Sequence, residues 1–144
     1  MKTIYLDTNI FLNVLLEEKE FVESSFQLLS DIEIGKFKTI TSFITLMEIH
    51  RILQKNGKDE AIIEKVIKTI STSSIEIDLP DGIDMFNAYE LLKKYKLDPI
   101  DALHVNTAVE QGAIFVSRDN VLIKKVKSII KTAIPEEINL NKIQ

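Results

Sequence analysis

The sequence predicts an α/β domain of three layers, with about five mostly parallel strands and helices on both faces of the sheet. The first observation is that short β-rich apolar runs alternate with helical patterns along the chain, which is typical of strand–helix–strand units. The second is composition, because 45% of the 144 residues are hydrophobic and only 4 are Gly and 3 are Pro. Such a chain can fill a core and has no linker-like stretch. We therefore expect one domain over residues 1–144.

The expected elements of the first half follow from apolar spacing and turn residues. β-Rich runs predict strands over residues 3–6 and 37–41, and 3.6-residue spacing predicts helices over 10–16, 21–29 and 42–55. Gly57 can end the last of these in the left-handed conformation. Asp59 can then cap a further helix, whose apolar positions recur from residue 62 to residue 70.

The second half continues the alternation. The pattern predicts strands over 74–79, 113–116 and 131–134, and helices over 85–95, 99–110 and 121–130. Asp98 suits the N-cap of the helix over 99–110, and Pro99 suits its first turn. Gly112 ends that helix, and Pro135 stops the last strand.

Composition excludes several classes of function. The 18 basic and 22 acidic residues give a net charge of −4, which argues against a broad basic surface that coats nucleic acid. There are no cysteines, which excludes disulfides, thiolate catalysis and Cys-ligated metals. No apolar run approaches the roughly 20 residues of a membrane span, and Asp7 and Asn9 interrupt the N-terminal apolar stretch. We expect a cytoplasmic protein with no membrane association.

Two polar turns follow predicted strands. They are Asp7-Thr8-Asn9, after the first strand, and Ser117-Arg118-Asp119-Asn120, after the strand over 113–116. In parallel sheets, ligand sites lie where the carboxyl ends of the strands meet the helices. Each turn places a carboxylate beside a hydroxyl, so these turns are the first candidates for a functional site.

Two further acids lie in rows of apolar residues. Glu48 is four residues from both Ile44 and Ile52, and Asp101 begins a row with Val105 and Val109. Both carboxylates are therefore expected to face inward. A buried charge is costly without a cation, a hydrogen-bond network or protonation.

Each acid also has a purely structural interpretation. Asp7 and Asp119 could cap the helices that follow them, Asp101 could interact with its helix dipole, and Glu48 could pair with Arg51 on the surface. Four clustered acids would repel one another, which favours a shared cation. Oxygen ligands without thiolates suit Mg²⁺ or Mn²⁺, which can activate water and stabilise a leaving oxygen in phosphodiester hydrolysis.

The order and context of these acids resemble the PIN-domain ribonucleases, and among them the VapC-like toxins of toxin–antitoxin pairs. The resemblance covers nearly the whole chain. Four short motifs carry it: Ile4-Tyr5-Leu6-Asp7-Thr8-Asn9, Met47-Glu48-Ile49, Pro99-Ile100-Asp101-Ala102-Leu103-His104 and Val116-Ser117-Arg118-Asp119. The resemblance implies a PIN-like three-layer domain in which four acids are catalytic and bind the metal, with three supporting polar groups: Asp7, Glu48, Asp101 and Asp119, then Thr8, Asn9 and Ser117.

The resemblance also implies an activity and partners. The activity is Mg²⁺- or Mn²⁺-dependent endonucleolytic cleavage of RNA, and a chain of this length is similar to type II toxins, which form homodimers and bind a cognate antitoxin. The helices over 10–16 and 21–29 are the candidate surface for a dimer or an antitoxin, with core packing as the alternative. A catalytically inactive PIN-like module and an RNA-processing nuclease are the alternative functions.

The histidines, Arg118 and Lys124 have their own interpretations. His50 and His104 have no hydrolytic-triad context, so both are expected to be packing or surface residues. Arg118 and Lys124 are candidate RNA contacts, although lysines such as Lys124 commonly form a solvated helix face. A haloacid-dehalogenase-type phosphatase or a receiver domain would need acids that the turn around Asn9 lacks.

Overall fold

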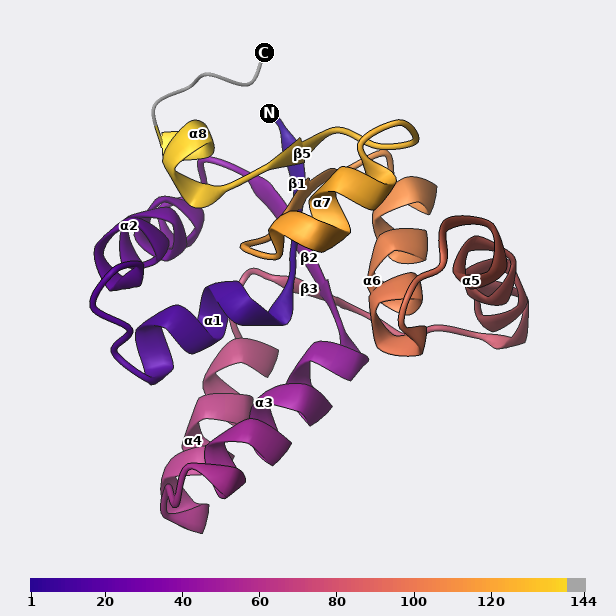
Figure 1. The fold of residues 1–144 in the computed structure, drawn as a ribbon. Coiled ribbons are helices and arrows are strands. Elements are labelled where there is room, and N and C mark those ends of the chain that lie inside the picture. Colours follow the sequence, from indigo (N-terminus) through magenta and orange to yellow (C-terminus); the bar gives the residue numbers. More distant parts are fainter. Residues whose placement is uncertain (140–144) are drawn as a thin grey trace.

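A computed structural model describes residues 1–139 and contains one parallel sheet (Figure 1). Its five strands are β1 (Thr3–Leu6), β2 (Lys38–Ser42), β3 (Glu76–Asp78), β4 (Ile114–Val116) and β5 (Thr132–Ala133). Their order is β3-β2-β1-β4-β5, and every neighbouring pair is parallel. The predicted fold class is confirmed. The end of the predicted domain, residues 140–144, lies outside the described residues.

Helices cover both faces of the sheet; α6 lies next to β2 and β4, and α5 packs against α6 on the side away from the strands (Figure 1). Most helices begin at or within three residues of their predicted starts. The bounds of the helices are α1 (Thr8–Leu15), α2 (Val22–Glu33), α3 (Phe43–Lys55), α4 (Glu60–Ser71), α5 (Gly82–Tyr95), α6 (Pro99–Glu110), α7 (Asn120–Val126) and α8 (Pro135–Asn139). No helix within residues 1–139 combines the length and apolar character needed to cross a membrane.

The side chains of β1 alternate between two buried clusters. Ile4 and Leu6 belong to a cluster that includes residues of α1 to α4 and α8, whereas Tyr5 lies in a second cluster with residues of α5, α6 and α7. Ile4, Tyr5 and Leu6 are all fully buried. This is the pattern of a central parallel strand that is covered on both sides.

Side-chain caps set the start of several helices. Asp59 accepts a hydrogen bond from the amide of Ala61, and Asp98 accepts one from the amide of Ile100, each at 3.0 Å. Both are the predicted N-caps. Gly57 follows α3 with a φ of 73°, the left-handed conformation that glycine adopts without strain.

The C-terminal part differs from the prediction. Helix α7 ends at Val126, whereas the pattern predicted a helix to residue 130. The carbonyl of Val126 accepts from the amides of both Ile129 and Ile130, so the chain turns there and both side chains, partly buried, pack against the second buried cluster. Pro135 ends the last strand as expected, but it also begins α8, because its fixed φ suits the first turn of a helix.

Candidate active site

The site lies at the carboxyl ends of the central strands. Because β1 pairs with both β2 and β4, the residues directly after these strands meet at one edge of the sheet. Asp7 follows β1 and is 6% exposed. Its Oδ1 accepts from the amide of Thr8 at 2.8 Å, and its Oδ2 accepts from the hydroxyl of Ser117, which follows β4, at 2.7 Å.

Glu48 faces this edge from the middle of α3. Its Oε1 accepts a hydrogen bond from the Thr8 hydroxyl at 2.5 Å and lies 2.8 Å from Nε2 of His104. Burial opposes ionisation of Glu48, but the hydrogen bonds from His104 and Thr8 outweigh it and lower the pKa of the carboxyl below its usual value. Glu48 is therefore ionised and faces inward, as the apolar row predicted. Its hydrogen-bond partners, Thr8 and His104, are both buried.

Asp101 supplies the third carboxylate, in the first turn of α6. Burial, followed by the negative charges of Asp7, Asp98 and Asp119, raises its pKa to about 6. No hydrogen bond to the Asp101 carboxylate occurs within residues 1–139. Asp101 is thus a partly buried acid beside other acids, and it forms no salt bridge within residues 1–139.

Asp119 is the fourth acid and lies on the exposed side of the site. Its Oδ1 accepts from the amide of Leu122 at 3.0 Å, so it caps α7. Asp7 also caps α1, by accepting from the amide of Thr8. The capping interpretation is therefore correct for these two acids. Asp101 lies in the first turn of α6 behind the Asp98 cap, where an acid interacts favourably with the helix dipole as expected. Capping uses one carboxylate oxygen of Asp119 and leaves the other available.

The predicted supporting groups connect the two turns. The Asn9 amide nitrogen lies 3.4 Å from Oδ2 of Asp7 and 3.3 Å from the Ser117 hydroxyl, and its oxygen accepts from the backbone of Arg118 at 3.2 Å. The Ser117 hydroxyl also accepts from the amide of Asp119 at 3.0 Å. These bonds hold the turns after β1 and β4 in one arrangement.

The chemistry of the ligands fits a hard divalent cation. The oxygens of Asp7, Glu48, Asp101 and Asp119 are the ligand type that Mg²⁺ and Mn²⁺ prefer. Within the described part of the chain, however, no three acidic or histidine side chains form a preassembled metal site. The raised pKa of Asp101 is consistent with this separation of the acids, because charges repel one another over longer distances than metal–ligand bonds span.

His104 is the site residue that sequence reasoning missed. Its burial, at 1% exposed, agrees with the expected packing role, but its Nε2 also lies 2.8 Å from Glu48 and 3.8 Å from Oδ1 of Asp7. Burial opposes its protonation, but the Glu48 hydrogen bond and the surrounding acids raise the pKa of His104 overall. The available signal was its spacing, because residues three apart share a helix face and His104 is three residues after Asp101.

Arg118, a candidate RNA contact, instead has its guanidinium group inside a structural network. Its side chain is 9% exposed, and Nη1 donates to Glu136 at 2.6 Å. Its other nitrogens donate to Asn13 at 3.1 Å and to Ser24 at 2.6 Å, and the group stacks 4.4 Å from the Phe21 ring. These contacts connect α1, α2 and α8, so Arg118 has a structural role. An RNA contact of Arg118 stays a prediction.

Replacing Arg118 by methionine is expected to destabilise the protein by about 2–3 kcal/mol, because charge-assisted bonds are lost and buried acceptors are left unpaired. Urea unfolding measures the change. The matched control is Lys124→Met, which alters an exposed lysine and should change stability by no more than about 0.5 kcal/mol. Equal stabilities for the two variants would contradict the structural role.

Lys124 is exposed on α7. The lysine is close in sequence to Asp119, and nothing in the described residues engages its ammonium group. It stays a prediction as an RNA contact.

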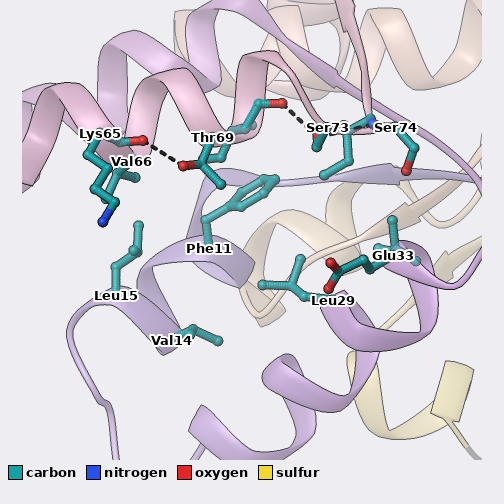
Figure 2. Close-up of a pocket in the computed structure, with 13 residues that line it drawn as sticks. Phe11, Val14, Leu15, Leu29, Glu33, Lys65, Val66, Thr69, Ser73 and Ser74 are labelled. Carbon is teal, nitrogen blue, oxygen red and sulfur yellow. Dashed lines mark hydrogen bonds between the residues drawn. The ribbon is translucent and has the colours of Figure 1, made fainter.

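A pocket of about 590 Å³ lies between α1, α2 and α4, and none of the four candidate metal-binding acids lines it. Figure 2 shows Phe11 and Leu15 from α1 and Leu29 from α2 along its wall. Its lining is mainly apolar, with Glu33 and Lys65 as the charged members. The predicted partner surface, helices 10–16 and 21–29, thus contributes a concave apolar site.

Comparison with protein families matches residues 4–128 to the model of the PIN domain. The chain belongs to the PIN domain family. Comparison with curated proteins gave no match. The matched residues include all four acids.

Solved structures share this fold. A toxin–antitoxin complex from Klebsiella pneumoniae has 20% identity and a TM-score of 0.67, over 92% of this chain and 97% of that one. VapBC2 from Rickettsia felis, bound to a promoter DNA fragment, has 20% identity and a TM-score of 0.66, over 92% and 98%. A protein from Pyrobaculum aerophilum has 14% identity and a TM-score of 0.66, over 98% and 94%. At these identities the likeness supports the PIN fold.

Proposed function

We propose that this PIN domain is a metal-dependent endoribonuclease that hydrolyses RNA phosphodiester bonds. The observation that carries the proposal is the state of Asp101. Its carboxylate is partly buried, has no hydrogen bond in the described part of the chain, and has a pKa raised to about 6 by burial and neighbouring acids. A cation between these acids would remove the repulsion.

The four acids would hold Mg²⁺ or Mn²⁺, with Asp7 buried, Glu48 and Asp101 partly buried, and Asp119 exposed. When bound, such an ion lowers the pKa of a coordinated water and neutralises charge on the leaving oxygen. Ser117 and the Thr8 amide orient Asp7. The Thr8 hydroxyl and His104 orient Glu48.

We propose that the protein acts as the toxin of a type II toxin–antitoxin pair, in the cytoplasm. The toxin–antitoxin complexes among the structures of the same fold support this role. We assign the apolar pocket to an apolar segment of the antitoxin, because its wall is largely apolar and its volume of about 590 Å³ exceeds what core packing leaves open. The homodimer implied by the family resemblance stays a prediction.

The test is cleavage of labelled structured and unstructured RNAs by the purified protein with Mn²⁺ or Mg²⁺. We expect Asp7→Asn to lose more than about 100-fold in activity, since it removes a charge from the metal site. The fold should persist, because asparagine also caps helices. A chelator should abolish cutting by the wild-type protein.

The matched control is Asp59→Asn, which makes the same change at the exposed N-cap of α4. It should cut like the wild-type protein. Equal cutting by Asp7→Asn would contradict the proposed role of Asp7. Metal binding without cutting of any RNA would favour the inactive PIN-like module, and cutting confined to RNA precursors would favour a processing nuclease.

A further inference from the structure

A buried chain of hydrogen bonds leads from the core to Glu48. The hydroxyl of Tyr5 lies 2.6 Å from Nδ1 of His104, and Nε2 of His104 lies 2.8 Å from Oε1 of Glu48. An ionised carboxylate only accepts hydrogen bonds, so Nε2 carries the proton of the second bond. Nδ1 of the neutral ring can then accept the phenolic proton of Tyr5, and the Tyr5 oxygen can accept from Nδ1–H when the ring is protonated.

The rings of Tyr5 and His104, which form this chain of hydrogen bonds, are held in place by close packing. Tyr5 is 0% exposed and His104 is 1% exposed. The Tyr5 ring stacks on Phe115 with 5.9 Å between centroids, and it meets the His104 ring edge-on at 5.7 Å. Tyr5 lies on the central strand β1, so the sheet itself sets the position of the imidazole.

The chain of hydrogen bonds from Tyr5 determines which oxygen of Glu48 accepts a hydrogen bond from His104. Oε1 receives both the His104 and the Thr8 hydrogen bonds, whereas Oε2 has no hydrogen bond within residues 1–139. Asp7 approaches the same imidazole nitrogen, with its Oδ1 at 3.8 Å. His104 therefore lies close to both Asp7 and Glu48, and within residues 1–139 it contacts only one oxygen of Glu48.

We propose that His104, oriented by Tyr5, is a positioning residue that holds the Glu48 carboxylate beside Asp7 with Oε2 directed to a divalent cation. This inference rests on the proposed metal-dependent function. Groups that hydrogen-bond to metal ligands fix their orientation, and their loss lowers metal affinity or activity by about 10-fold to 100-fold.

The experiment measures Mn²⁺ affinity by isothermal titration calorimetry. His104→Leu removes the donor and keeps an apolar side chain of moderate size, and we expect its affinity to fall by about 10-fold to 100-fold. His104→Gln restores an N–H near the position of Nε2 and should recover most of the affinity. Tyr5→Phe keeps the ring but removes the hydroxyl, and should cause a smaller loss.

Two controls separate positioning from a general effect on folding. His50→Leu makes the same change at a histidine of α3 whose side chain is 40% exposed, and its Mn²⁺ affinity should equal that of the wild-type protein. Thermal unfolding in chelator reports the folding of every variant. A crystal structure of Tyr5→Phe or His104→Leu should show the Glu48 carboxylate turned from its wild-type position.

The outcomes distinguish this inference from the proposed function. Mn²⁺ binding that weakens in His104→Leu and recovers in His104→Gln supports the inference even where no RNA is cut. Wild-type affinity in a folded His104→Leu overturns it, whether or not RNA is cut. If His104→Leu fails to fold, unchanged Mn²⁺ affinity in Tyr5→Phe overturns it, and reduced affinity supports it. A wild-type protein that binds no Mn²⁺ overturns both proposals.

Discussion

Asp101→Asn is expected to lose more than about 100-fold of RNA cutting while the metal-free protein becomes more stable. The loss follows because the variant removes one carboxylate from the proposed cation site. The gain follows because the Asp101 carboxylate is partly buried beside Asp7 and Asp119, whose charges oppose its ionisation. Replacing it with a neutral side chain of the same shape removes that repulsion.

The stability that Asp101→Asn gains over the wild-type protein should increase as the pH rises. The pKa of Asp101 is raised to about 6 in the folded protein, from the 3.8 of an unperturbed aspartate. Below 3.8 the group is protonated in both the folded and unfolded states, so Asp101→Asn should have no electrostatic advantage. Between 3.8 and about 6 the folded state binds more protons, and the wild-type protein loses stability as the pH rises. Above that window the advantage of the variant is constant.

Urea unfolding in chelator, from about pH 3.5 to about pH 8, spans this pH window. It measures the difference in stability between Asp101→Asn and the wild-type protein. Asp59→Asn serves as the control, because it exchanges the same residue types at an exposed N-cap. Its stability difference from the wild-type protein should lack the rise between the two pKa values. A flat difference profile for Asp101→Asn would contradict the electrostatic account, and full cutting activity would contradict the metal-site role of Asp101.

Val14→Glu is expected to weaken antitoxin binding by roughly 30-fold or more, equivalent to about 2 kcal/mol at a central interface position. Val14 lies in the wall of the apolar pocket between α1, α2 and α4 (Figure 2). A carboxylate there would be taken out of water and placed against an apolar partner segment. RNA cutting by the free protein should persist, because none of the four acids lines this pocket.

The probe is the protein encoded beside this chain's gene, coexpressed with it and then titrated in a purified system. Val121→Glu is the matched control, since Val121 is 66% exposed on α7 and lies outside the pocket. It should bind the partner as the wild-type protein does. Equal binding by Val14→Glu would assign the antitoxin to another surface, while an absence of binding by the wild-type protein would contradict this choice of partner.

Much of the fold was predictable because its signals are local. The N-caps Asp59 and Asp98 and the left-handed Gly57 depend on residues within one helical turn. Helix α8 was missed because Pro135 has two local meanings, the end of a strand and the first turn of a helix.

The candidate acids were also predictable from sequence, because each has a distinctive position. Asp7 and Asp119 follow strands, and Glu48 and Asp101 interrupt apolar rows. The structure places all four around one edge of the sheet, since β1 lies between β2 and β4. Their roles as metal ligands stay predictions until a cation is measured.

Sequence by itself determined the α/β class, the sequence of strands and helices, and the acids at the strand ends, since apolar periodicity and helix caps are local properties. Only the tertiary structure decided what those acids contact. His104 is 56 residues from Glu48 and 99 from Tyr5, yet it hydrogen-bonds to both. Arg118 forms a salt bridge with Glu136 of α8. Such contacts depend on strand order and helix packing, which bring together residues that no local pattern relates.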